Sequence, residues 1–250
     1  MNHEMLKQRA TALSLYGLLE QWEALTTEHI QFLSTWFTWE EEARHHRSLK
    51  RRLTQAKIGR FKSLVDFDWK WPKKLDQAAI QELMTLEFLN EASNLIFLGT
   101  NGVGKTTIAK NIAHKAVLSG KTVLFTSASN MLNELADQDG DLALRRRLKR
   151  YSQPDLLVID EVGYLSYGDR HADLMFDIVN SRYEKKSTLV TTNRAFSEWH
   201  EVFPNASCVV SLVDRLMHHA EVITFEGSSY RLKESKEKDV QRKQARKRNK

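Results

Sequence analysis

The segment GTNGVGKTT (99–107) follows the apolar run LIFL and combines three glycines with one lysine and two threonines. Its spacing, G-x-x-x-x-G-K-[ST], is typical of a loop that holds nucleotide phosphates. Glycines let backbone N–H groups turn towards an anion, and a helix beginning there adds the positive end of its dipole. We expect the whole loop to contact phosphate: Gly99, Thr100, Asn101, Gly102, Val103, Gly104, Lys105, Thr106 and Thr107.

Two residues of this loop have side chains suited to further chemistry. The Lys105 ammonium is expected to reach the β- and γ-phosphates of ATP, and the Thr106 hydroxyl is expected to ligate Mg²⁺. The alternative is an ordinary glycine-rich turn, but the apolar run before the loop and the helical pattern after it favour phosphate binding.

A pair of acids ends a second apolar run, LLVIDE (156–161). A buried strand that ends in carboxylates presents them at the edge of a parallel sheet where ligands bind. We expect Asp160 to hold Mg²⁺ through water, and Glu161 to polarise the water that attacks the γ-phosphate. An acidic pair at a strand end is often only solvated, so this interpretation depends on the phosphate loop upstream.

A third apolar run, LVTTN (189–193), ends in small polar residues. Asn193 could orient the attacking water between Glu161 and the γ-phosphate, which would make it part of the catalytic group. The alternative is that Asn193 caps the helix that follows, because asparagine begins many helices.

These groups need a scaffold that brings strand ends together. Short apolar or β-branched runs recur with helical patterns between them, at 94–100, 122–128, 155–161, 187–193 and 221–227. One such helical pattern follows the phosphate loop and closes with Gly120. Five buried strands separated by helices predict an α/β fold with a parallel, doubly wound sheet.

The first 71 residues have a different texture, with five of the six tryptophans and a helical spacing of leucines. We predict a small all-helical domain over 1–70, a nucleotide-binding domain over 71–232 and a disordered basic tail over 233–250, with a connector around Pro72. The tail carries nine Lys/Arg and three Asp/Glu, and the rest of the chain has 29 of each sign. The net charge of +6 therefore belongs to the tail.

Composition also limits the cellular setting. A single cysteine excludes a disulfide framework, and no apolar stretch is long enough to span a membrane. We expect a cytoplasmic protein. The nine histidines are scattered without convincing metal-ligand spacing.

Two basic stretches, at 43–62 and 145–150, could bind DNA phosphates, although such runs are equally often solvated helix faces. The candidate DNA-binding residues are Arg44, Arg47, Lys50, Arg51, Arg52, Lys57, Arg145, Arg146, Arg147, Lys149 and Arg150.

Taken together, these motifs resemble a known family, the IstB-like ATPases, which are transposition helper proteins of bacterial insertion sequences related to DnaC helicase loaders of the AAA+ superfamily. The resemblance covers most of residues 1–235. It is carried by the segments GTNGVGKTTIAK, LLVIDEVGYLSYG, NSRYEKKSTLVTTN, LVDRLMHHAEVITFEGSSYRLK and EEEARHHRSLKRRLTQAKI.

The resemblance implies a AAA+ P-loop NTPase that hydrolyses ATP with Mg²⁺, assembles on double-stranded DNA and delivers that DNA to a partner transposase. It also implies a homo-oligomer whose ATP sites are shared between subunits. Arg215, in VDRL, matches the arginine finger of the family, and Arg231, in SYR, matches a nucleotide-contacting sensor-2 arginine. Little chain follows Arg231, so we expect no full helical lid domain.

Other functions fit the motifs less well. A helicase loader would share the mechanism but have a replicative helicase as its partner. A small-molecule P-loop kinase would need a substrate pocket and a lid with phosphate-clamping arginines. A GTPase would need an N/T-K-x-D motif, which is missing. A DNA-binding module without enzymatic activity would not need Lys105, Asp160 and Glu161.

Overall fold

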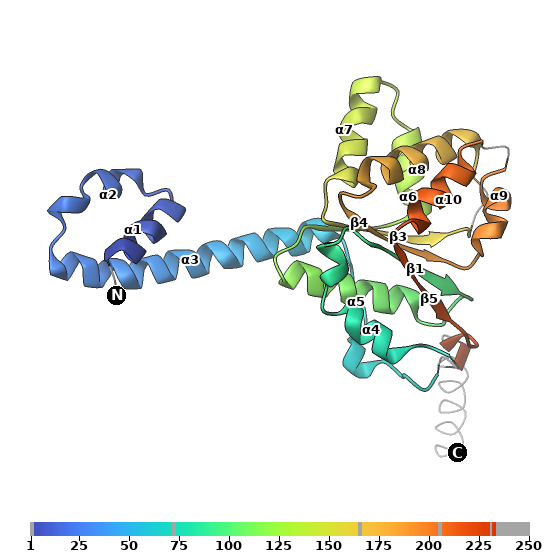
Figure 1. Cartoon of the computed structure of the whole chain (residues 1–250), viewed down its shortest axis with the longest axis horizontal. Helices are drawn as coiled ribbons and strands as arrows, with labels where there is room; N and C mark the ends of the chain where they lie inside the picture. Colours follow the sequence, from blue (N-terminus) through green and yellow to red (C-terminus); the bar gives the residue numbers. More distant parts are fainter. Residues whose placement is uncertain (1–2, 72–73, 165–166, 205–206, 231, 234–250) are drawn as a thin grey trace, which may run out of the picture. The chain divides into compact units, whose positions relative to one another are not determined.

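A computed structural model describes residues 3–71, 74–164, 167–204, 207–230 and 232–233 of the 250-residue chain (Figure 1). The chain divides into two compact units, Met1–Arg52 and Leu53–Lys250. Most of the tail that was expected to be disordered, 234–250, lies outside the described residues.

The first unit is helical. It contains α1 (His3–Ala12), α2 (Tyr16–Glu20) and most of the long helix α3 (Thr27–Ala56). One face of α3 packs on the other helices because its apolar residues recur three and four positions apart. The buried side chains of this core are Leu6, Ala10, Leu13, Trp22, Ile30, Leu33 and Phe37.

Among the described helices, none combines the length and the apolar character needed to cross a membrane.

The second unit is built on a five-stranded sheet with the order β2-β3-β4-β1-β5. Every pairing in the sheet is parallel. The strands are β1 (Asn94–Gly99), β2 (Val123–Ser127), β3 (Leu156–Val162), β4 (Ser187–Thr192) and β5 (Ala220–Phe225). This sheet confirms the predicted α/β fold, and each strand begins and ends within two residues of its predicted run.

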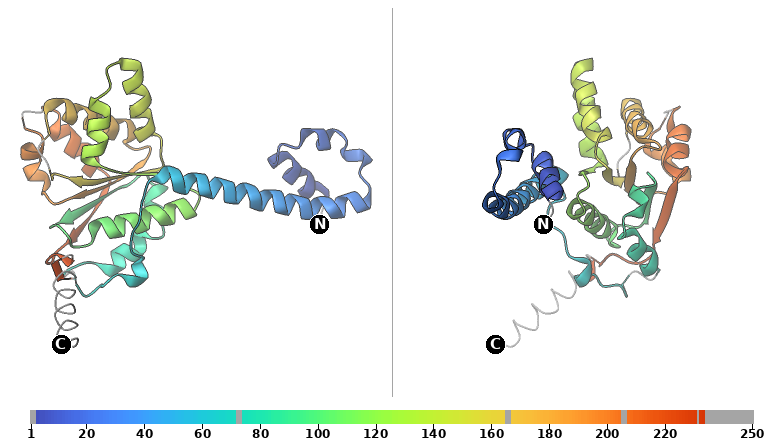
Figure 2. Two further views of the ribbon diagram at one scale, coloured as in Figure 1. Left: turned by 180° about the vertical axis from the view of Figure 1, so that it is seen from behind. Right: turned by 60° about the vertical axis from the view of Figure 1, so that its left-hand side comes forward.

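Helices cover both faces of the sheet, as Figures 1 and 2 show. Helix α5 (Lys105–Leu118) lies on one face, and α6 (Ala128–Ala136), α8 (Asp169–Arg182) and α10 (Val209–Met217) lie on the other. The strand order requires this, because right-handed crossovers that run in opposite directions along a sheet lie on opposite faces. The crossover through α5 leads from β1 to the edge strand β2, and the later crossovers lead back.

The remaining helices are short or peripheral. They are α4 (Gln77–Leu83), α7 (Asp141–Ser152) and α9 (Trp199–Val202). Gly120 follows α5 with a φ of +88°, in the left-handed conformation that a residue after a helix end often adopts, as its place in the sequence predicts.

The segment after α3 packs along α5 and therefore belongs to the second unit. The side chain of Asn111 accepts a hydrogen bond from the Leu64 amide (3.1 Å) and donates one to the Lys62 carbonyl (2.9 Å). The division into units thus falls at Arg52, whereas the change of sequence texture lies near residue 70.

Candidate nucleotide-binding site

The predicted phosphate loop connects the end of β1 to the beginning of α5, so the helix N-terminus faces the loop. Gly102 and Gly104 both have positive φ, +79° and +107°. A Cβ added to Gly102 would lie 2.3 Å from Ser229 Oγ, and one added to Gly104 would lie 2.8 Å from a ring carbon of Phe67. These glycines are therefore needed for close packing as well as for backbone conformation.

Lys105 lies within the curve of the loop. It is 5% exposed, and its Nζ donates to the carbonyls of Gly99 (2.6 Å) and Thr100 (2.8 Å). The loop thus holds a buried ammonium beside its own backbone, in a position where a phosphate in the loop could compete for the ammonium protons.

Three oxygen atoms meet next to the loop. The carboxylate oxygen Oδ1 of Asp160 accepts hydrogen bonds from the hydroxyls of Thr106 (3.0 Å) and Thr191 (2.5 Å). Asp160 is 6% exposed. A hydroxyl and a carboxylate are hard oxygen ligands of the kind that Mg²⁺ prefers, so the donor atoms of Thr106 and Asp160 fit this ion.

A bulge in β3 sets the direction of the second acid. The register between β3 and β4 shifts between Ile159 and Val162, and Glu161 has a φ of +63°. Its amide donates to the Thr191 hydroxyl at 3.0 Å. A positive φ is costly for a residue other than glycine, and such strain is often found at functional sites. The bulge re-aims the side chain at the end of the strand.

Asn193 follows the end of β4, and it caps neither of the two helices that come next. The residues at the N-termini of those helices are Ala195 and Glu198, and neither helix has a side-chain cap. The Asn193 Oδ1 atom is buried without a hydrogen-bond partner among the described residues. The structure thus leaves the helix-capping alternative unsupported and an acceptor available at the strand end.

Arg215 lies away from the phosphate loop of its own chain. The carbonyl of the next residue, Leu216, accepts a hydrogen bond from the Asn94 side chain at the beginning of β1, whereas the loop follows Gly99 at the end of that strand. Six strand residues span roughly 17 Å. The Arg215 guanidinium stacks over the Phe176 ring at 4.5 Å, and its buried Nη1 has no hydrogen-bond partner in the described part of the chain.

The remaining predicted site residues are distributed over both units. Arg231 lies outside the described residues. Arg44 and Arg47 pair with Glu40 on α3, at 2.7 and 3.1 Å. Lys50, Arg51 and Arg52 also lie on α3, and Lys57 follows its end.

On α7 the predicted DNA-binding residues fall into two groups. Arg147 and Arg150 both form ion pairs with Glu134 of α6, at 2.7 and 2.6 Å. Arg145, Arg146 and Lys149 are exposed, and no ion pair to them is found among the described residues.

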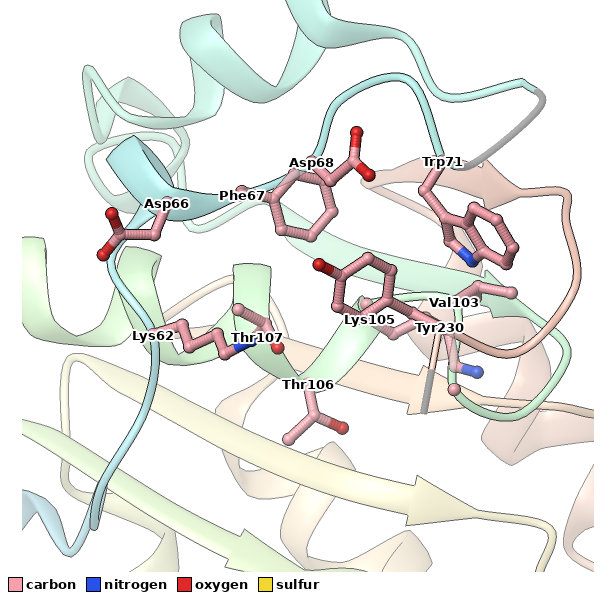
Figure 3. Close-up of a pocket in the computed structure, with 12 residues that line it drawn as sticks. Lys62, Asp66, Phe67, Asp68, Trp71, Val103, Lys105, Thr106, Thr107 and Tyr230 are labelled. Carbon is pink, nitrogen blue, oxygen red and sulfur yellow. The ribbon is translucent and has the colours of Figure 1, made fainter. Parts of the chain in front are cut away.

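A pocket of about 250 Å³ opens beside the phosphate loop (Figure 3). One wall is the loop itself from Gly102 to Thr107. The other wall is aromatic and acidic, and it comes from two segments that lie far apart in the sequence. Its residues are Lys62, Asp66, Phe67, Asp68, Trp71 and Tyr230.

Contacts between these two segments hold the aromatic wall together. Trp71 Nε1 donates to the Ser228 carbonyl (2.8 Å), and the Trp71 and Tyr230 rings meet edge to face, 5.9 Å apart. The Tyr230 amide donates to the Gly102 carbonyl (2.9 Å) and so attaches the wall to the loop. Lys233 pairs with Asp68 at 3.0 Å and lies 4.5 Å from the Trp71 ring.

Sequence reasoning missed this aromatic wall and the Thr191 hydroxyl. The sequence predicts only a connector at DFDWKW (66–71), and the tyrosine of GSSY (227–230) belongs to a segment that carries the family resemblance. The signal that could have identified them is the presence of aromatic residues in two segments near the two ends of the predicted nucleotide-binding domain.

The chain matches the family model described as IstB-like ATP binding protein over residues 5–238. A relative named for ATP binding in insertion sequence IS21 of Pseudomonas aeruginosa is 34% identical over 235 residues, which are 94% of this chain and 89% of the relative. A relative with a similar name in IS232 of Bacillus thuringiensis subsp. berliner is 37% identical over 191 residues, which are 74% of this chain and 76% of that one.

Solved structures share the fold. DnaI superposes with a TM-score of 0.54 at 21% identity, over 69% of this chain and 92% of that chain. AMPPCP-bound DnaA from Aquifex aeolicus superposes with a TM-score of 0.55 at 23% identity, over 70% of this chain and 54% of that chain. The family match and the identity to the insertion-sequence relatives show that this chain belongs to the IstB-like ATP binding proteins.

Proposed function

We propose that this protein is a Mg²⁺-dependent ATPase that assembles on double-stranded DNA and assists a partner transposase. The observation that carries the proposal is the meeting of Thr106 and Asp160 at 3.0 Å beside a glycine-rich loop that encloses Lys105. A hydroxyl, a buried carboxylate and a buried ammonium at one strand edge suit a metal–triphosphate better than any other ligand class.

ATP would lie with its triphosphate in the loop and its base in the adjoining pocket. The rings of Trp71 and Tyr230 offer apolar faces and edges of the kind on which a purine packs. The names of the relatives from insertion sequences, which refer to ATP binding, support this choice of nucleotide.

The residues at the strand ends would divide the chemistry of hydrolysis. Mg²⁺ held by Thr106 and Asp160 would neutralise charge on the phosphates. Glu161 would accept a proton from the attacking water, and the unpartnered Oδ1 of Asn193 would orient that water. Lys105 would balance charge on the β- and γ-phosphates.

DNA binding and the transposase partner rest on different support. The exposed cations of α7 suit phosphate contacts, and the relatives belong to insertion sequences. A helicase loader is the alternative, and the likeness to DnaI concerns the fold alone.

Turnover and binding by matched variants test the ATPase. Glu161→Gln should bind ATP within about threefold of the unaltered protein and lose most hydrolysis, because an amide accepts no proton from water. Lys105→Ala should lose ATP binding itself, because the triphosphate loses its cation within the loop. Fluorescence polarisation of a labelled ATP analogue and phosphate release measure the two steps.

Exposed residues elsewhere provide controls. Glu91→Gln and Lys115→Ala change a glutamate and a lysine that are exposed and lie outside the pocket, so both variants should behave as the unaltered protein. Normal hydrolysis by Glu161→Gln would assign the base to another residue, and normal nucleotide affinity of Lys105→Ala would refute the phosphate-loop assignment.

A further inference from the structure

A group of metal-ligating side chains lies where strands β4 and β5 begin. Glu184 is in the turn that leads from α8 into β4, and His218 and His219 directly precede β5. The phosphate loop follows the end of β1, which is parallel to both strands. The group therefore lies at the opposite edge of the sheet from the candidate nucleotide-binding site.

The three side chains point their donor atoms at one another. His218 Nδ1 lies 3.8 Å from Glu184 Oε1, and His219 Nε2 lies 3.6 Å from the same oxygen. All three donor atoms lie within 4.8 Å of one another. In the described part of the chain, which contains all nine histidines and the cysteine, this is the only group of three such donors.

The two separations from Glu184 Oε1, 3.8 and 3.6 Å, are close to those around a bound zinc ion. Bonds of about 2.0–2.1 Å at tetrahedral angles place adjacent donor atoms about 3.3 Å apart. The three side chains are between 50% and 54% exposed, so they can close the remaining gap by small changes of side-chain torsion. Two imidazoles and one carboxylate are also a common set of zinc ligands, with water in the fourth position.

The backbone and a neighbouring tyrosine support the arrangement. Glu184 has a φ of +56°, a conformation that is much easier for glycine, and this turn brings the carboxylate towards the end of α10. The Tyr183 hydroxyl lies 2.7 Å from His218 Nδ1. A metal ion would displace it from that nitrogen, after which the hydroxyl can donate to the Glu184 carboxylate and orient it.

We propose that Glu184, His218 and His219 form a surface site for a zinc ion, which would join the turn after α8 to the segment between α10 and β5. The site requires neutral imidazoles, so protons compete with the metal ion for the ligand nitrogens. The proposal does not depend on ATP hydrolysis, because it concerns the opposite edge of the sheet.

Calorimetric titration of the full-length, tag-free protein with Zn²⁺ at pH 7.5 tests the site. We expect one saturable equivalent in excess Mg²⁺, because Mg²⁺ prefers oxygen ligands. His218→Ala with His219→Ala should weaken binding at least tenfold, and Glu184→Gln should weaken it several-fold. Zn²⁺ should also raise the melting temperature of the unaltered protein and leave that of the double variant unchanged.

The chain supplies a matched control in its other adjacent histidine pair. His45 and His46 are both exposed on α3 and belong to no group of three donor atoms among the described residues, so His45→Ala with His46→Ala should bind Zn²⁺ normally. Absence of saturable binding would refute the site. An equal loss of Zn²⁺ affinity in the two double variants would also refute it. The same holds if the affinity for Zn²⁺ is unchanged when His218 and His219 are replaced.

Discussion

At the scale of single residues, one hydroxyl links both candidate catalytic acids. The Thr191 hydroxyl donates to Asp160 and accepts from the backbone amide of Glu161, and it projects from the neighbouring strand β4. Asp160 and Glu161 could be predicted from the sequence, because acids at the end of an apolar run lie at the ligand-binding edge of a parallel sheet. Thr191 could not, because its importance depends on strand pairing and on the bulge that turns Glu161.

Replacement of this hydroxyl should therefore impair hydrolysis more than folding. Thr191→Val keeps the side-chain volume but removes a hydrogen-bond donor from Asp160 and an acceptor from the Glu161 amide, and loss of such orienting contacts typically costs about 10–100-fold in metal affinity or activity. We expect a higher Mg²⁺ requirement and lower turnover, with rescue by Thr191→Ser. Thr126→Val, on β2, removes a hydroxyl outside this junction and is the control. A normal Mg²⁺ requirement would assign Thr191 a packing role only.

At the scale of elements, the strands could be predicted from the sequence, but the aromatic wall of the pocket and the ion pairs on α7 could not. Every residue of β4 is buried, so its apolar character identifies it without knowledge of its neighbours. The aromatic wall depends on contacts such as that between Trp71 and Ser228, which are separated by 157 residues. No local pattern encodes such a contact. The ion pairs that occupy Arg147 and Arg150 are invisible in the sequence for the same reason.

Helix α7 presents two kinds of cation, and only one kind should bind DNA. Arg145, Arg146 and Lys149 are exposed, whereas Arg147 and Arg150 are held by Glu134. Replacement of the first three by alanine should reduce the slope of log affinity against log salt by about 2–3, because each lost phosphate contact removes about 0.9. Lys115→Ala with Lys185→Ala is the charge control. An unchanged slope would make the exposed face of α7 an ordinary solvated surface.

At the edge of the sheet where the strands begin, one carboxylate connects several chain segments through hydrogen bonds. Asp155, which precedes β3, accepts hydrogen bonds from the amide (2.9 Å) and hydroxyl (2.7 Å) of Thr122 and pairs with Lys186. Burial alone would raise the pKa of this carboxyl, but the bonds from Lys186 and Thr122 outweigh it and lower the pKa to about 2. Since the ordinary value is 3.8, the native state favours the ionised form.

This shift predicts a pH-dependent effect on stability. A depressed carboxyl pKa stabilises the fold fully above about pH 4, and this contribution is lost as the pH falls towards 2. Asp155→Asn should therefore lower the free energy of unfolding at pH 7 by about 1 kcal/mol, after allowance for partial exposure, and the deficit should shrink by pH 3. Urea unfolding at pH 7, 5, 4 and 3 measures this. Asp139→Asn, at an exposed position, is the control, and a constant deficit would exclude ionisation as the cause.

At the scale of the whole molecule, the position of Arg215 argues for action between subunits. Leu216, its neighbour, bonds to the residue that begins β1, so the guanidinium cannot reach the loop that follows the end of that strand in its own chain. The buried Nη1 has no partner among the described residues, and neither of the nearby acids, Asp214 and Glu221, forms an ion pair with it. A head-to-tail assembly would bring this edge of one subunit to the nucleotide of the next.

A mixing experiment tests whether Arg215 acts on a neighbour's ATP. Arg215→Ala and Lys105→Ala should each hydrolyse ATP poorly, because an arginine supplied in trans is worth about 10³–10⁵ in rate. In an equal mixture of the two variants, about one quarter of the interfaces would combine an intact loop with an intact arginine from the adjacent subunit, given a head-to-tail contact. Phosphate release should recover in proportion to this fraction of complete interfaces. The double variant mixed with Arg215→Ala should give no recovery, since no subunit then supplies the arginine. Mixed assemblies that stay inactive would show that Arg215 does not complete a neighbouring site.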